Sequence, residues 1–235
     1  MALRLVFLHG RFENSTTWIP LTERLSEQLQ GARLLVEFLA VELDDPGAST
    51  LEGQARALLE LIEHTSPRSR IVLVGHDTGG ALAQVAAALA PERVRGLVLL
   101  NTASPFRPCT RLPLEKLVLA GLHTLLPEYA RDILSSSSRQ GSHAQWPEPE
   151  ESKGWKQVLS AQSIPALLLW GSGDHFQSLE CAREAYLIFS QARFSTCECG
   201  HWPHLESVEW TADRMQEFIF RLRYGTNRDH EKESA

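Results

Sequence analysis

The stretch Ile71-Val72-Leu73-Val74-Gly75-His76-Asp77-Thr78-Gly79-Gly80 decides the fold, because a buried apolar run ends in a glycine-bounded turn. Four consecutive apolar residues are typical of a strand covered on both faces, as in a parallel sheet. The alanine-rich segment 81–90 continues from the turn. A strand that turns at once into a helix strains its middle residue and brings the positions two before and two after together, so Gly75 and Gly79 must lack side chains. This spacing is that of a nucleophile elbow, with Asp77 where serine is commoner.

Strand-like and helix-like segments alternate on both sides of this turn. Short apolar runs predict strands, and apolar stripes at helical spacing predict helices. Strands are expected within 4–8, 34–43, 71–74, 94–100, 166–170 and 192–197, and helices within 18–29, 51–62, 81–90, 179–189 and 206–221. This order predicts an α/β fold with a doubly wound, mostly parallel sheet of about six strands and helices on both faces.

The alternation is interrupted after residue 104. Residues 112–126 have the pattern of an amphipathic helix, whereas the serine run 135–138 and the stretch Trp146-Pro147-Glu148-Pro149-Glu150-Glu151 are typical of loops. We therefore predict one core formed by residues 1–104 and 164–222, a small helical cap insertion at 105–163 and a polar C-terminal tail at 223–235. A length of 235 residues suits one such core.

Composition excludes several classes of function. The net charge of −6 argues against a nucleic-acid partner, since no excess of basic side chains is present to meet a phosphate backbone. No apolar run approaches the roughly 20 residues that span a bilayer. The four cysteines form no C-x-x-C pair, and no helical histidine pair with a supporting carboxylate predicts a metal site. We expect a cytoplasmic protein, monomeric or homodimeric, that acts on a small molecule without metal or cofactor and without a membrane.

Three further stretches extend the pattern around the elbow. The first is His9-Gly10, which follows the first strand. The second combines a strand with a terminal acid, in Pro165-Ala166-Leu167-Leu168-Leu169-Trp170-Gly171-Ser172-Gly173-Asp174. The third carries a histidine, in Cys199-Gly200-His201-Trp202-Pro203-His204-Leu205-Glu206. In this order and spacing the chain resembles the α/β-hydrolase fold superfamily over residues 3 to about 222. The resemblance implies a catalytic set of Asp77, His201 and Asp174.

An aspartate on the elbow narrows the resemblance to the epoxide hydrolases and the haloalkane or haloacetate dehalogenases. An aspartate is ionised at neutral pH, so it attacks an sp3 carbon without a base and leaves an alkyl ester. His201, oriented by Asp174, would then deprotonate the water that hydrolyses this ester. The backbone N–H groups of Arg11 and Thr78 are the expected oxyanion donors.

The sequence departs from each of these branches. Thr78 and Arg11 stand where haloalkane dehalogenases usually have Trp and Asn, and the Arg that usually follows the nucleophile of haloacetate dehalogenases is absent. Phe12 replaces the usual Pro of epoxide hydrolases, and Tyr129 is the one tyrosine in the cap where two usually protonate the leaving oxygen. The missing Trp weakens a halide site more than the lack of a second tyrosine weakens proton donation to an alkoxide. This slightly favours an epoxide as the substrate.

Several site assignments have a plainer alternative. Trp146 and Trp155 are predicted to line a substrate pocket from the cap, but packing explains them equally well. His76 and His204 are expected to be hydrogen-bonded structural histidines. Asp77 could instead be a general base in an ester, thioester or lactone hydrolase or a lyase. A member of the fold that only binds a ligand is the third alternative.

Overall fold

Six parallel strands form a single sheet in the computed structural model, which describes residues 3–11, 13–43, 50–67, 70–106 and 147–225. The strands follow one another across the sheet in the order β2-β1-β3-β4-β5-β6, and every neighbouring pair is parallel. Their bounds are β1 Leu3–Leu8, β2 Val36–Val41, β3 Ile71–His76, β4 Val94–Leu100, β5 Pro165–Gly171 and β6 Gln191–Cys197. The predicted sheet is therefore confirmed.

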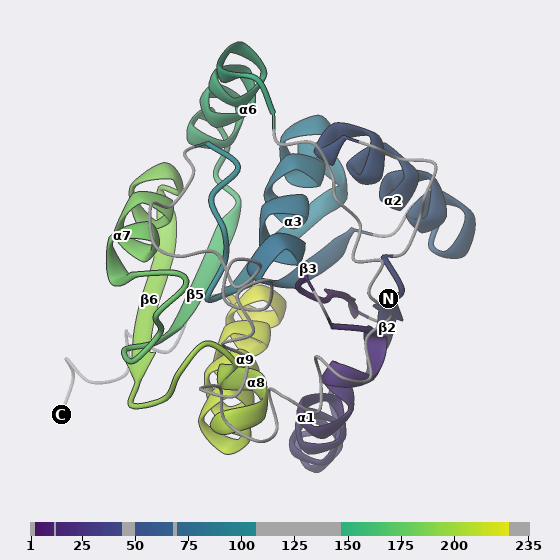
Figure 1. The fold of residues 1–235 in the computed structure, drawn as a ribbon. Helices are drawn as coiled ribbons and strands as arrows, with labels where there is room; N and C mark the ends of the chain where they lie inside the picture. The colour runs from purple at the N-terminus through teal and green to yellow at the C-terminus, as the bar shows by residue number, and fades with distance from the viewer. Residues whose placement is uncertain (1–2, 12, 44–49, 68–69, 107–146, 226–235) are drawn as a thin grey trace, which may run out of the picture.

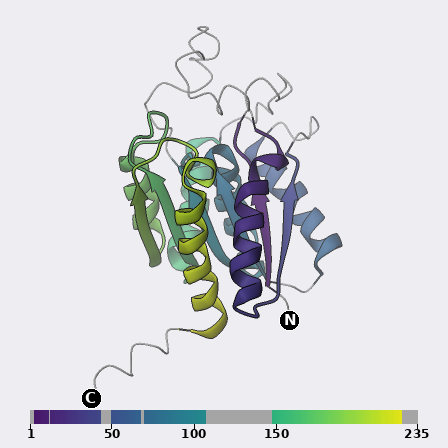
Figure 2. The same ribbon diagram turned by 90° about the horizontal axis from the view of Figure 1, so that it is seen from below.

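Helices cover both faces of the sheet (Figure 1). On one face, α1 (Ile19–Gly31) and α9 (Val208–Tyr224) run side by side, as Figure 2 shows. The opposite face carries α2 (Leu51–Thr65), α3 (Asp77–Leu89), α6 (Pro149–Ala161) and α7 (Leu179–Ile188). Short helical turns lie at η1 (Ser15–Trp18), η2 (Pro91–Arg93) and α8 (Pro203–Glu206).

The core is divided by the sheet into two apolar clusters. Side chains alternate between the faces of a strand, so Leu97 and Leu99 of β4 join the cluster beneath α2 and α3, whereas Val98 and Leu100 join the one beneath α1 and α9. All four side chains are fully buried. Continuous apolar runs in the sequence thus reflect strands covered by helices on both sides.

One predicted loop is wrong. The sequence predicts irregular structure over residues 146–151, but α6 begins at Pro149, whose fixed φ suits the first turn of a helix. The backbone N–H of Glu148 donates to the Glu151 side chain, which stabilises this helix start. α6 packs against α3. The predicted helix at 112–126 and most of the predicted cap lie outside the described residues, so the cap remains a prediction.

The strand order reverses next to β1, because the chain passes from β1 outward to β2 and then returns to β3 on the other side of β1. In open α/β sheets, ligands bind at the carboxyl ends of the strands beside such a reversal. The residues that follow β1 and β3 are His9-Gly10-Arg11 and Asp77. None of the described helices is both long and apolar enough to cross a bilayer.

Gly79 of the elbow leaves no room for a side chain. A Cβ at Gly79 would lie 2.2 Å from the backbone oxygen of Leu8 and 2.4 Å from that of His9. Gly79→Ala must therefore push β1 and α3 apart, and we expect it to destabilise the protein by about 3 kcal/mol, lowering Tm by roughly 6–12 °C. Thermal unfolding measures this.

The matched control is Gly154→Ala in α6, where a Cβ meets nothing within 4 Å. That change should leave Tm unchanged or raise it, because alanine is favoured over glycine by about 1 kcal/mol inside a helix. Equal destabilisation by the two alanines would contradict this account of the elbow.

Candidate active site

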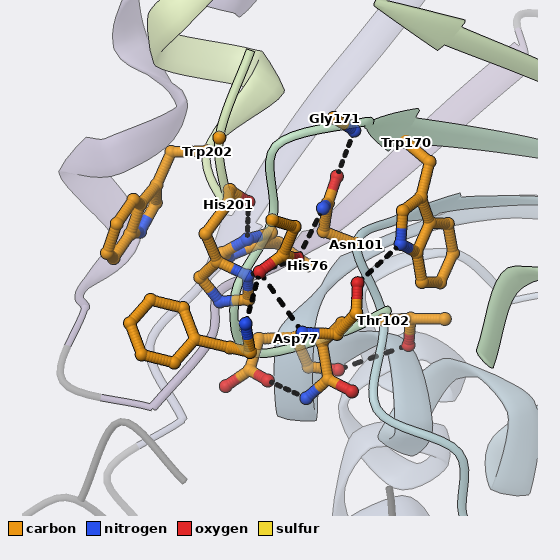
Figure 3. Close-up of polar contacts among 12 residues, drawn as sticks. His76, Asp77, Asn101, Thr102, Trp170, Gly171, His201 and Trp202 are labelled. Carbon is orange, nitrogen blue, oxygen red and sulfur yellow. Dashed lines mark hydrogen bonds and ion pairs between the residues drawn. The ribbon is translucent and has the colours of Figure 1, made fainter. Parts of the chain in front are cut away.

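Asp77 stands on a sharp turn between β3 and α3. Its φ is 45°, in the left-handed region that a residue with a side chain enters at a cost. The turn is fixed by its own carbonyl oxygen, which accepts hydrogen bonds from Thr102 Oγ1 at 3.1 Å and from the Ala103 backbone N–H at 3.0 Å (Figure 3). A Cβ at Gly75 would lie 2.5 Å from the Gly79 backbone oxygen, as the elbow prediction requires.

The two carboxylate oxygens of Asp77 have different partners. Oδ1 accepts a hydrogen bond of 3.0 Å from Gln177 Nε2, and Oδ2 accepts a long one of 3.4 Å from the Arg11 backbone N–H. The Thr78 N–H lies in the first turn of α3, where backbone N–H groups have no partner within the helix. Oδ2 thus already faces one of the two predicted oxyanion donors.

His201 and Asp174, which the sequence predicts as a catalytic pair, lie in direct contact. His201 Nδ1 lies 2.8 Å from Asp174 Oδ2, and both side chains are buried. Asp174 lies in the loop after β5, and its Oδ1 accepts hydrogen bonds from the backbone N–H groups of Phe176 at 2.6 Å and Gln177 at 3.1 Å. Both oxygens of this carboxylate therefore have hydrogen-bond donors. An ionised Asp174 accepts a hydrogen bond from Nδ1–H, which leaves Nε2 of His201 as the nitrogen that can act on water.

The electrostatics of this pair favour opposite charges. Burial alone would lower the pKa of His201, but the charge and hydrogen bond of Asp174, with smaller contributions from Asp77 and Glu13, raise that pKa to about 9. Burial would likewise raise the pKa of Asp174, but His201, the amide of Asn101 and the Phe176 N–H together hold it below its usual value. In the resting protein the imidazole is therefore mainly protonated at neutral pH.

Asn101 supports Asp174 at the end of β4. Its φ is 38°, its Nδ2 donates to Asp174 Oδ2, and its Oδ1 accepts the Gly171 N–H at 2.9 Å (Figure 3). Asn101 therefore links the ends of β4 and β5 behind the acid. The sequence places it at a strand end, but nothing local indicates this contact with a residue 73 positions away.

The loop that carries His201 is held by two carboxylates. Glu206 accepts the backbone N–H groups on both sides of the histidine, from Gly200 at 2.8 Å and from Trp202 at 3.0 Å. Glu13, in the turn after β1, accepts the indole N–H of Trp202. The loop of His201 is thus tied both to the helix that follows it and to the turn after β1.

One buried group of described residues has the composition of a metal site. Ligand atoms of Glu13, His76 and His204 lie within 4.8 Å of one another. However, the Glu13 oxygens already accept N–H donors from Gly10 and Trp202, and Glu13 forms an ion pair of 2.9 Å with His76. The Glu13 oxygens are thus occupied by N–H donors, which fits a structural contact better than a cation site, and His204 Nε2 lies 3.0 Å from Thr17 Oγ1.

The remaining predicted site residues are not brought to this centre by the described part of the chain. Trp155 is buried in the core cluster that also contains Leu159 and residues of α3. Tyr129 and Trp146 lie outside the described residues, so their roles remain predictions. Gln177 and Glu13 are contacts that sequence reasoning missed, because both depend on loops meeting from distant strands.

Comparison with known proteins agrees with this geometry. Residues 5–214 match the family described as the alpha/beta hydrolase family. Lipase 1 of Psychrobacter immobilis is 23% identical over 91% of this chain and 76% of its own length. Among solved structures, a thermophilic esterase from Thermogutta terrifontis superposes with a TM-score of 0.73 at 22% identity, covering 94% of this chain and 91% of its own.

Naproxen esterase from Bacillus subtilis gives a TM-score of 0.70 at 18% identity, over 93% of this chain and 84% of its own. At such identities the structural likeness concerns the fold. The family match spans the elbow, the acid strand and the histidine loop. This chain therefore belongs to the alpha/beta hydrolase family.

Proposed function

We propose that this hydrolase uses Asp77 as a nucleophile on an sp3 carbon of a small, mostly apolar substrate, as in an epoxide hydrolase or a dehalogenase. The observation that carries the proposal is the unequal environment of the Asp77 oxygens. Oδ2 faces a backbone N–H of the oxyanion turn, whereas Oδ1 is held by a side-chain amide that can turn away. A carboxylate placed in this way can attack through one oxygen while the other is already stabilised.

In the first step, Oδ1 of Asp77 forms a bond to the substrate carbon. The bond from that carbon to its leaving group breaks, and the electron pair departs with a halide or with an alkoxide that takes a proton from water. The product of this step is an alkyl ester at Asp77 whose carbonyl oxygen is Oδ2. No base is needed, because the nucleophile is already an anion.

In the second step, His201 Nε2 takes a proton from water and the resulting hydroxide attacks Cγ of Asp77. The Arg11 and Thr78 N–H groups stabilise the developing oxyanion at Oδ2, which by analogy with similar sites is worth about 3 kcal/mol for each donor. Collapse breaks the bond between Cγ and Oδ1, and His201 returns its proton to the departing alcohol. Asp174 keeps the imidazole in the required orientation throughout.

A single turnover in heavy-oxygen water tests this order of events. With enzyme in excess over styrene oxide or bromobutane, the new hydroxyl of the product should carry light oxygen from Asp77, and the peptide containing Asp77 should gain one heavy oxygen. Mass spectrometry of product and peptide measures both. Under repeated turnover the product should become labelled as well, which serves as the control. Heavy oxygen in the product of the first turnover would reject the covalent route.

Ester hydrolysis is the second candidate, because the relatives compared above are named as a lipase and esterases. In that case Asp77 would act as a general base on water. Turnover of p-nitrophenyl butyrate, with none of styrene oxide or bromobutane, would favour it. A cytoplasmic location, a monomeric or homodimeric state and a small-molecule substrate remain predictions from the sequence.

A further inference from the structure

A buried ion pair lies directly behind the catalytic histidine. His76, the residue before Asp77, donates from Nε2 to the backbone carbonyl oxygen of His201 at 2.8 Å (Figure 3). Its Nδ1 lies 2.9 Å from Glu13 Oε1, and both side chains are about 1% exposed. Neither residue touches the nucleophile's carboxylate oxygens in any hydrogen bond among the described residues, so the mechanism above does not use them.

The contacts of His76 orient its ring between a carbonyl oxygen and a carboxylate. A carbonyl oxygen can only accept, so Nε2 of His76 carries a proton, while Nδ1 faces the Glu13 carboxylate at 2.9 Å. Burial would raise the pKa of Glu13, but the charge and hydrogen bond of His76, together with His204 and the Gly10 N–H, hold that pKa far below its usual value. The pair therefore consists of an ionised carboxylate and an imidazole ring that are both sealed from water.

Glu13 connects this pair to two loops of the site. Its Oε2 accepts the Gly10 backbone N–H at 2.8 Å, in the turn that presents the Arg11 oxyanion donor. Its Oε1 accepts the indole N–H of Trp202, the residue after His201. Burying such polar groups away from water costs free energy. That cost is offset only where each group finds a well-placed hydrogen-bond partner, as the Glu13 oxygens do here.

We propose that Glu13 and His76 are positioning residues that hold the backbone of His201, and therefore its imidazole, against the oxyanion turn for the water-activating step. This inference rests on the proposed function for its kinetic consequence, but not for its structural one. His76 acts through the His201 carbonyl, so its loss should impair the step that needs His201 and spare the attack by Asp77.

The test compares double variants that remove the carboxylate and the imidazole together, so that no carboxylate is left buried without its partner. E13Q/H76Q keeps a donor near the position of Nε2, whereas E13Q/H76F removes it. E13Q/H76N is a second donor-free variant, since the shorter amide lies nearer residue 13 and away from the His201 carbonyl. Decay of the ester formed with styrene oxide, measured by rapid quench and mass spectrometry, should slow about tenfold in E13Q/H76F and E13Q/H76N, the value of one lost hydrogen bond.

In the same experiment, E13Q/H76Q should decay within about threefold of the wild type, and the formation rate of the ester should be similar in all variants. A merely structural role would lower the active fraction without changing the decay rate of each adduct. A second readout needs no substrate: the low-field proton resonance of the His201–Asp174 hydrogen bond should persist in E13Q/H76Q and be lost or shifted in E13Q/H76F and E13Q/H76N.

The outcomes separate the two proposals. Equal decay rates and an unchanged resonance in all three variants would overturn the positioning role. Failure to form an ester even when His201 is replaced would overturn the proposed function, while the resonance would still decide the role of His76. One equivalent of bound metal in the purified protein would also overturn the ion pair, because a cation would displace the His76 proton.

Discussion

Asp77→Asn is expected to lower kcat on an epoxide or alkyl halide at least about ten-thousandfold, because the amide cannot form the ester intermediate. Asparagine keeps the volume of aspartate, and its oxygen can still accept from the Arg11 N–H, so the fold should be retained. Steady-state kinetics with styrene oxide or bromobutane, beside an unchanged Tm, measure this. Residual activity within about a hundredfold of wild type would show that the reaction does not pass through this carboxylate.

Asp77→Ser separates the nucleophile from a general base. Serine would complete a Ser-His-Asp set with His201 and Asp174, and the oxyanion donors Arg11 and Thr78 are unchanged. We expect hydrolysis of p-nitrophenyl butyrate to rise at least about tenfold over the wild type, while activity on the alkylating substrates is lost. If wild-type Asp77 is instead a base for ester hydrolysis, the wild type should already turn over p-nitrophenyl butyrate and should show no activity on the alkylating substrates for the serine variant to lose.

The fold could be predicted from the sequence because its signals are local. The central buried strands contain continuous apolar runs, as at 71–74 and 97–100, and the first of these is followed directly by a turn and a helix. The strained position of Asp77 was also predictable, since Gly75 and Gly79 indicate a turn in which the backbone segments lie too close together for side chains. The start of α6 at Pro149 was missed because proline and glutamate are common in loops, and the distinction depends on packing against α3.

The site was predictable only in part, because its supporting contacts join residues far apart in the chain. The pair His201 and Asp174 follows from two motifs at strand ends. Gln177, by contrast, reaches a residue 100 positions away, and Glu13 meets Trp202 across 189 positions. Only the three-dimensional meeting of the loops after β1, β3, β5 and β6 reveals that these polar side chains face the centre.

His201→Phe is expected to trap the alkyl ester. Attack by Asp77 needs no base, so the adduct should still form, whereas its hydrolysis should slow about ten-thousandfold without the water-activating imidazole. Phenylalanine fits a site where the His201 ring already packs edge-on against Phe176 at 5.0 Å between ring centres. Intact-protein mass spectrometry after exposure to styrene oxide should show one added substrate mass, absent from the double variant with Asp77→Asn.

Hydrolysis of this ester should also reveal a change in the pKa of His201 during the reaction. In the free enzyme that pKa is raised to about 9, and the negative charge of Asp77 is one of the causes. Esterification removes this charge, so the pKa of His201 should fall below its free-enzyme value and release the neutral base when the second step needs it. Because only the neutral imidazole accepts a proton, the decay rate of the wild-type ester should rise with pH and level off above the lowered pKa.

The pKa of His201 in the ester and its pKa in the free enzyme come from separate measurements. Rapid quench gives the first from the decay of the adduct at different pH values, and NMR titration of the His201 ring gives the second. Asp174→Asn is the control, because it removes the largest attraction that raises the His201 pKa and should lower that pKa in the free enzyme as well. In a general-base mechanism Asp77 stays ionised, so the pKa of His201 would have no reason to fall on substrate binding. A kinetic pKa equal to that of the free enzyme would therefore contradict the expected fall in the His201 pKa, whereas a lower one ties proton release from His201 directly to the loss of the Asp77 charge.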